Sequence, residues 1–157
     1  MKKLIASIAI LLSMVSATLY LKYRVSENSI DIQCYATFKK NITSGLYSDG
    51  NISIHLFSNH HGIANVVGKM TSGEEVYTIN REIGFIYDII DIRKGVFKMG
   101  GDYFKVLSRD NMPSRYDDDI NLNSSSKKSD YLIIRKINKN TWLFSSPINP
   151  IMLCVEV

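Results

Sequence analysis

The sequence predicts a mainly β protein, in which an apolar N-terminal segment precedes a single antiparallel, curled or barrel-like β domain. Three observations support this fold class. After residue 30, short runs of alternating apolar and polar residues recur along the chain, separated by glycine, asparagine and serine. No long amphipathic helix interrupts them, and short connections favour antiparallel pairing because parallel strands need long crossovers. The only two cysteines lie near the two ends of this region.

Nine or ten short strands are expected in this domain. The first is the clearest, because apolar residues alternate with polar ones from Ile30 to Phe38. A turn at Asp49-Gly50 is expected to precede the second strand. The expected strands cover residues 30–38, 52–56, 63–70, 76–81, 85–92, 96–99, 103–107, 131–137, 142–144 and 152–157.

Glycine and asparagine mark the expected boundaries between strands. Gly84 separates two of the strands, and Gly100-Gly101-Asp102 and Asn138-Lys139-Asn140 have the composition of hairpin turns. One longer interruption, Ser108 to Asp130, is polar and is expected to hold a single helical turn or to act as a flap. The charge clusters that it contains, Asp117 to Asp119 and Lys127-Lys128, are expected to lie in a solvated loop.

The N-terminal segment contains eighteen residues without a charge, from Leu4 to Leu21. As a helix it would span about 27 Å, close to the thickness of the hydrocarbon core of a bilayer. It is either a signal peptide cleaved after Val15-Ser16-Ala17 or an uncleaved anchor that ends before Lys22 and Arg24. The run is longer than the apolar core of a signal peptide, about 7–15 residues, which favours the anchor. The expected organisation is a cytoplasmic tip at 1–3, a transmembrane signal-anchor at 4–21, a linker at 22–29 and an exported β domain at 30–157.

The net charge of +4 is concentrated before the β domain. Four of the 19 basic residues and one of the 15 acidic residues precede residue 30, which leaves 15 basic and 14 acidic residues in the domain. A nearly neutral domain lacks the basic surface with which proteins bind nucleic acid. Direct contact with nucleic acid is therefore not expected.

The two cysteines, Cys34 and Cys154, are expected to form one disulfide, because exported proteins fold in an oxidising compartment. Such a bond would close a loop of about 120 residues and contribute about 4–5 kcal/mol to stability on the chain-entropy estimate. The first and last strands would then lie side by side. Two buried free thiols are the alternative, and a metal pair is less favoured because no histidine is close to either cysteine in sequence.

The residues that could support catalysis are few, and no enzyme, cofactor site or metal site is expected. His55, His60 and His61 lie close together in sequence, but adjacent histidines on a strand point to opposite faces and do not readily share a metal ion. Because histidine titrates near pH 6.5, these three residues are candidates for sensing external pH. Arg81 lies within an expected strand, where it either pairs inside the mouth of the barrel or is exposed.

Several features together resemble the FidL-like family, in particular its branch of MyfF and PsaF accessory proteins from Gram-negative bacteria. They are the short N-terminal anchor, the run Gln33-Cys34-Tyr35-Ala36-Thr37-Phe38, the glycine-punctuated strands, Ile79-Asn80-Arg81 and the terminal Pro150-Ile151-Met152-Leu153-Cys154. The resemblance extends over essentially the whole chain. It carries over Cys34 and Cys154, as a disulfide, and no catalytic residues.

The resemblance implies a role like that of the ToxS-type partners of ToxR-like transcription regulators. Such regulators have a cytoplasmic DNA-binding domain, one membrane span and a periplasmic domain. The accessory protein would be a single-pass protein of the inner membrane whose periplasmic domain stabilises or activates the regulator in a heteromeric complex. In the MyfF and PsaF branch, the output is transcription of a fimbrial or surface-antigen operon.

A ligand-binding protein of lipocalin type is the main alternative. The chain contains nine tyrosines, six phenylalanines and one tryptophan. In a curled β domain these side chains either enclose an apolar cavity for a small ligand or form an ordinary core. The two functions are compatible if a ligand modulates the complex.

Overall fold

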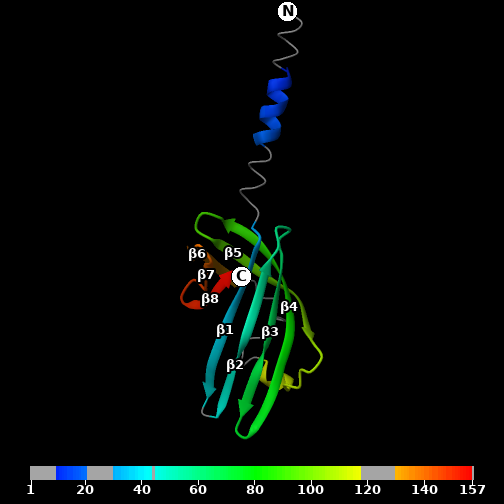
Figure 1. Ribbon diagram of the computed structural model, residues 1–157, viewed down its shortest axis with the longest axis vertical. Coiled ribbons are helices and arrows are strands. Elements are labelled where there is room, and N and C mark those ends of the chain that lie inside the picture. Colours follow the sequence, from blue (N-terminus) through cyan, green and yellow to red (C-terminus); the bar gives the residue numbers. More distant parts are fainter. Residues whose placement is uncertain (1–9, 21–29, 44, 118–129, 157) are drawn as a thin grey trace, which may run out of the picture.

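The computed structural model describes residues 10–20, 30–43, 45–117 and 130–156 (Figure 1). Eight strands form one sheet. Their bounds are β1 (Ile32–Thr43), β2 (Leu46–Leu56), β3 (His61–Ser72), β4 (Glu75–Asp91), β5 (Val96–Val106), β6 (Asp130–Asn138), β7 (Thr141–Ser145) and β8 (Pro150–Glu156). A 3₁₀ helix, η1 (Ser114–Tyr116), lies between β5 and β6.

The sheet is a closed antiparallel barrel in which each strand pairs with its neighbours in sequence. Short hairpin connections allow this arrangement, and closure removes most of the exposed edges that a flat sheet would have. The predicted antiparallel, barrel-like β domain is confirmed. The barrel closes where β1 meets β8, through the register pairs Cys34 with Glu156 and Tyr35 with Val155.

The strands differ in length, so the two ends of the barrel differ. The hairpins of β1 to β4 are long and extend to one end of the domain, whereas β6, β7 and β8 gather at the other end, where β1 begins (Figure 1). Among the described residues, β5 pairs with β6 over four positions, Val96–Met99 with Asp130–Ile133. The closed part of the barrel is therefore confined to one end.

Two groups of side chains form the core. The larger group lies in the closed part and contains the two cysteines with Tyr87, Phe97 and Phe144. The smaller group lies under the long hairpins and contains Val66, Met70, Ile79 and Met112. Met112 comes from the segment after β5, which therefore covers this second group.

The prediction of nine or ten strands was wrong because two glycine signals lie inside strands. Gly84 is within β4, and Gly100-Gly101-Asp102 is within β5. Gly84 pairs with Tyr103 and Phe85 with Gly101, so Asp102 is the extra residue of a β-bulge. A Cβ atom on Gly84 would lie 2.1 Å from the ring of Tyr103. Glycine is needed there for close packing of a ring.

The predicted turn at Asp49-Gly50 was also wrong, because both residues lie within β2. Gly50 faces Gly68 of β3 in the register. A Cβ atom on Gly68 would lie 2.3 Å from the carbonyl oxygen of Asp49, so the two backbones approach more closely than other residues would allow. The hairpin at Asn138-Lys139-Asn140 is confirmed, since it joins β6 to β7.

The interruption after β5 contains the predicted helical turn, η1. The expectation that Asp117 lies in a solvated loop was wrong, because its side chain is 18% exposed and pairs with Arg81. The other residues of the two charge clusters lie outside the described part of the chain.

The predicted anchor at residues 4–21 is described only in part, as a helix over residues 10–20. Within the described ranges, no helix combines the length and the apolar character needed to cross a membrane. The anchor therefore stays a prediction.

Candidate functional site

Two features of the domain place reactive or charged side chains in a buried position. One is a disulfide and the other is an ion-pair network. The first lies at the seam between β1 and β8. Cys34 and Cys154 form a disulfide there, with their Cα atoms 5.4 Å apart. Both residues are fully buried. The predicted pairing of the first and last strands is confirmed, and the alternative of two free thiols is wrong.

Next to the disulfide, polar side chains join β8 to its neighbours β6 and β7. The indole Nε1 of Trp142, which pairs with Cys154 in the register, donates a hydrogen bond of 2.7 Å to Glu156. Lys136 lies 3.4 Å from the same carboxylate and 4.8 Å from the centre of the indole ring. The hydrogen bond from Trp142, followed by the contacts with Lys136, lowers the pKa of Glu156. The carboxylate is therefore ionised where it holds β6, β7 and β8 together.

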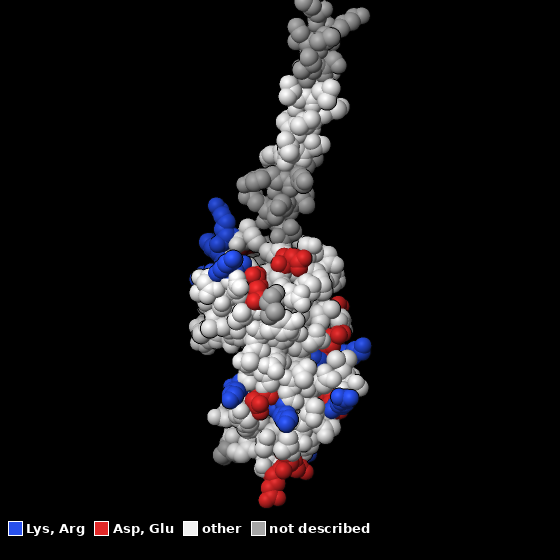
Figure 2. Space-filling view, viewed as in Figure 1, with Lys and Arg blue, Asp and Glu red and all other residues white. Residues whose placement is uncertain are grey.

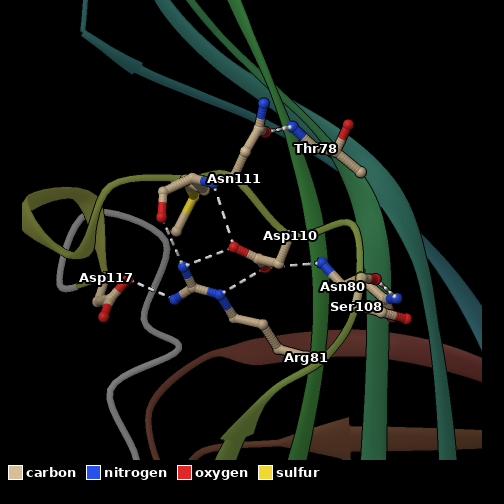
Figure 3. Close-up of polar contacts among 8 residues, drawn as sticks. Thr78, Asn80, Arg81, Ser108, Asp110, Asn111 and Asp117 are labelled. Atoms are coloured by element: carbon tan, nitrogen blue, oxygen red, sulfur yellow. Dashed lines mark hydrogen bonds and ion pairs between the residues drawn. The ribbon is translucent and has the colours of Figure 1, made fainter.

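The second feature is a buried ion-pair network around Arg81, drawn in Figure 3. The guanidinium donates Nε–H to Asp110 Oδ2 at 2.9 Å, and Nη2 lies 3.3 Å from Asp110 Oδ1. It also donates to Asp117 and, at 3.1 Å, to the carbonyl of Met112. The Arg81 and Asp110 side chains are 2% and 1% exposed. Burial disfavours the charged form of Arg81, but the hydrogen bonds to Asp110 and Asp117 outweigh it and raise its pKa.

The same network holds the segment after β5 against the edge of β4. Asp110 accepts the backbone N–H of Asn80 at 2.8 Å, and the Asn80 side chain donates to the Ser108 carbonyl at 2.8 Å (Figure 3). One residue further, the Asn111 side chain accepts the N–H of Thr78 at 2.6 Å. These side chains replace a neighbouring strand. The network thus closes an edge and positions Met112 over the second core group.

Both carboxylate oxygens of Asp110 accept hydrogen bonds from the protein, from Arg81 and from the backbone N–H groups of Asn80 and Met112. The prediction that Arg81 pairs inside the barrel is confirmed over its alternative of exposure. Sequence reasoning missed Asp110, because it lies 29 residues from Arg81 and no motif links them.

The family model described as "FidL-like putative membrane protein" matches residues 68–154. This match covers more than half of the chain. The chain belongs to the FidL-like family. No curated protein matches the sequence.

The match places the network and one cysteine of this FidL-like chain within the family region. Residues 68–154 begin near the end of β3 and include Arg81, Asp110, Asp117 and Cys154. Cys34, which completes the disulfide, precedes the matched region.

The three histidines of this FidL-like chain do not form one cluster. His55 Nε2 lies 3.0 Å from Asp31 Oδ1. His60 and His61 instead line one surface hollow of about 290 Å³, together with Tyr87, Asp88 and Lys98. His60 Nδ1 lies 3.2 Å from the Tyr87 carbonyl, and its ring stacks on Tyr87 with centroids 5.4 Å apart. Among the described residues, no group of three or more potential metal ligands comes together.

The pH-sensing role of the histidines stays a prediction. If it is right, replacing His55, His60 and His61 together with glutamine removes the dependence of the protein's output on external pH. The measurement is that output between pH 5.5 and 7.5, in steps of about half a pH unit, across the range in which histidine changes charge. A triple variant whose profile coincides with the wild type rules the role out.

Proposed function

We propose that this chain is an accessory protein of the bacterial inner membrane that binds and stabilises or activates a ToxR-like transmembrane transcription regulator. Residues 4–21 anchor it and residues 30–157 form its periplasmic domain. By analogy with the MyfF and PsaF branch, its output is expression of a fimbrial or surface-antigen operon. Membership in the FidL-like family, over residues 68–154, is the observation that carries the proposal.

The disulfide supports a periplasmic location. Disulfides form and persist in oxidising compartments such as the periplasm and are rare in the cytosol. Cys34 and Cys154 are bonded and buried in the core. This agrees with an apolar segment that leads the rest of the chain out of the cytoplasm.

The surface supports binding to a protein partner in the same membrane. Figure 2 shows basic and acidic side chains interspersed on one face of the domain, with broad areas that carry no charge. Such a surface suits contact with another protein domain better than contact with nucleic acid. Two proteins anchored in one membrane meet at high effective concentration, so modest contacts suffice.

The lipocalin-like alternative gains less support. An eight-stranded barrel is just wide enough for side chains to fill it or for one small ligand to enter. Here Tyr87, Phe97 and Phe144 are each 2% exposed and belong to the larger core group. These aromatic side chains therefore pack in the hydrophobic core.

The proposal predicts that a single-span DNA-binding regulator co-purifies with the tagged full-length protein from solubilised membranes. A Cys34→Ser/Cys154→Ser version is expected to recover much less of it, because the seam between β1 and β8 weakens. Mass spectrometry of the eluates identifies the regulator and measures how much of it each version recovers.

Residues 1–29 fused to an unrelated periplasmic domain provide the control, since they retain the anchor and lack the barrel. Recovery of the regulator with this fusion would assign binding to the N-terminal segment. A wild-type protein found free in the periplasm, cut after Ala17 and without a membrane partner, would contradict the proposal.

A further inference from the structure

The antiparallel order of the strands divides the connections between the two ends of the barrel. β1 begins at one end, and three turns lie at that same end, at residues 57–60, 92–95 and 139–140 (Figure 1). β8 also finishes there, because Glu156 pairs with Cys34 near the start of β1. We call this the entry end, since the chain enters the domain there. The turn between β3 and β4 lies at the opposite, far end.

Two neighbouring hairpins of the entry end carry a group of basic residues. The hairpins are β4 with β5 and β6 with β7, and they touch where the Gly95 carbonyl accepts the N–H of Ile134 at 2.8 Å. Five exposed basic residues lie on them: Arg93, Lys94, Arg135, Lys136 and Lys139.

This group exceeds the acidic residues that accompany it. Carboxylates at the same end have basic partners of their own, which are Asp31 with His55, Asp91 with Lys94, and Glu156 with Lys136. Within the described part of the chain, Arg93, Arg135 and Lys139 pair with no carboxylate. The entry end therefore has an excess of positive charge on a domain that is nearly neutral as a whole.

The far end differs in charge from the entry end. Its turn between β3 and β4 carries Glu74 and Glu75, with Arg115 near them. Figure 2 shows basic side chains projecting from the end where β1 begins and acidic ones at the opposite tip. Charges of both signs are interspersed along the side of the domain, but its two ends are polarised.

Exposed isoleucine side chains accompany the basic group. Ile90, Ile92 and Ile137 are 55%, 36% and 56% exposed, and they lie on the same two hairpins. Large apolar side chains enter the boundary between the headgroups and the acyl chains of a membrane, and basic side chains bind anionic headgroups. The combination is typical of a protein surface that lies on a lipid bilayer.

The length of the chain before β1 brings the entry end to the membrane. Eight residues, 22–29, separate the proposed anchor from the β domain. Fully extended, a chain of eight residues spans at most about 29 Å. An anchor at residues 4–21 therefore holds the entry end, with its basic and apolar side chains, within reach of the lipid surface.

We propose that the entry end is a peripheral membrane-binding surface, on which Arg93, Arg135 and Lys139 bind anionic phospholipid headgroups and Ile92 and Ile137 enter the interface. This inference rests on the proposed function, because the anchor supplies the proximity, and it adds an orientation in which the long hairpins extend away from the bilayer. Charge selects the lipid over a second copy of this chain. A copy tethered at the same height would present the same positive end, and like charges repel.

The test uses the full-length protein in vesicles of phosphatidylcholine alone, or of equal parts phosphatidylcholine and phosphatidylglycerol. Both contain a small fraction of lipid with a nitroxide on its headgroup, which quenches nearby tryptophan fluorescence. Trp142 is the only tryptophan of the chain, and it pairs with Lys136 at the entry end. We expect stronger quenching in the anionic vesicles. Sodium chloride at about 1 M, where the Debye length falls to about 3 Å, should remove the difference.

Two pairs of substitutions test the named residues. Arg93→Gln with Lys139→Gln is expected to lower the ratio of docked to undocked domains in anionic vesicles about tenfold, because each basic residue near an anionic surface contributes to binding. Lys39→Gln with Lys69→Gln is the matched control, since it removes the same charge from the long hairpins and should behave as the wild type. All four side chains are exposed, so both variants should melt at the wild-type temperature.

The other outcomes separate the surface from the anchor. If the protein floats with both kinds of vesicle, but quenching depends on neither lipid charge nor Arg93 and Lys139, the surface is wrong and the proposed function stands. Protein that floats with anionic vesicles only, and through these two residues, would confirm the surface and contradict the anchor. Unchanged quenching with reduced recovery of the regulator would assign the residues to the protein partner and overturn the inference. Protein that floats with neither kind of vesicle would contradict both.

Discussion

Replacing Cys34 and Cys154 together with alanine is expected to lower the free energy of unfolding by about 4 kcal/mol. The disulfide spans 120 residues, so in its absence the unfolded chain gains the conformational entropy of a very long loop. Alanine is preferable to serine for this measurement, because both positions are fully buried and serine would place hydroxyl groups in the core. A loss of this size is a large fraction of the 5–15 kcal/mol that typically stabilises a domain.

The geometry of the seam adds to the entropic effect. β1 and β8 share two register pairs, whereas β1 and β2 are paired along almost their full lengths. Without the covalent bond, few hydrogen bonds hold the barrel closed at this point. The amide groups of β8 are therefore expected to exchange with deuterium faster than those of β2 and β3.

Urea denaturation of the wild type, the double variant and the chemically reduced wild type measures this prediction. The reduced wild type is the control, because it loses the bond and keeps both sulfur atoms. It should unfold at nearly the same urea concentration as the double variant. A double variant within about 1 kcal/mol of the oxidised wild type would show that the seam is stable without the bond.

The sequence predicted the sheet but misplaced several strand ends, and glycine explains the difference. Gly73 and Gly95, at real turns, have positive φ angles of 62° and 67°. Gly84 and Gly100 lie inside strands. At Gly84 the missing side chain leaves room for the ring of Tyr103, and Gly100 lies next to the β-bulge of β5. A glycine looks the same in sequence whether the chain turns or another group approaches it closely, so composition could not separate the two.

The two buried features differed in how far the sequence could predict them. Cys34 and Cys154 were predictable, because they are the only cysteines and an exported chain favours their pairing. The Arg81 network was not, because Asp110 and Asp117 lie in an irregular segment whose path depends on the network itself. Aspartate-rich segments are usually solvated, and only the position of Arg81 inside a barrel reverses that expectation.

Replacing Arg81 with methionine is expected to destabilise the domain by about 3–5 kcal/mol, because Asp110 would remain as an uncompensated buried charge. Methionine retains much of the length of the side chain, so the effect reports mainly on charge and hydrogen bonding. The segment that carries Asp110 and Met112 should then detach from β4. Exposure of the second core group would follow, measurable by thermal unfolding and by binding of a hydrophobic dye.

Lys94→Met provides the matched control. Lys94 pairs with Asp91 at 3.5 Å, but its side chain is 76% exposed. Solvent screens such a pair, and its removal is expected to change the melting temperature little. Comparing Lys94→Met with Arg81→Met therefore separates the effect of losing a buried ion pair from the effect of losing a basic residue.

A second change at the same site distinguishes an unpaired charge from a general packing defect. Asp110→Asn, combined with Arg81→Met, removes the negative charge and keeps an oxygen that accepts the N–H of Asn80. The double variant is expected to recover about 1–2 kcal/mol relative to Arg81→Met alone, because the remaining penalty no longer includes a buried carboxylate. If the second change instead adds to the loss, Asp110 stabilises the segment without Arg81, through its bonds to Asn80 and Met112. The network would then be a backbone cap of β4 to which the arginine contributes little.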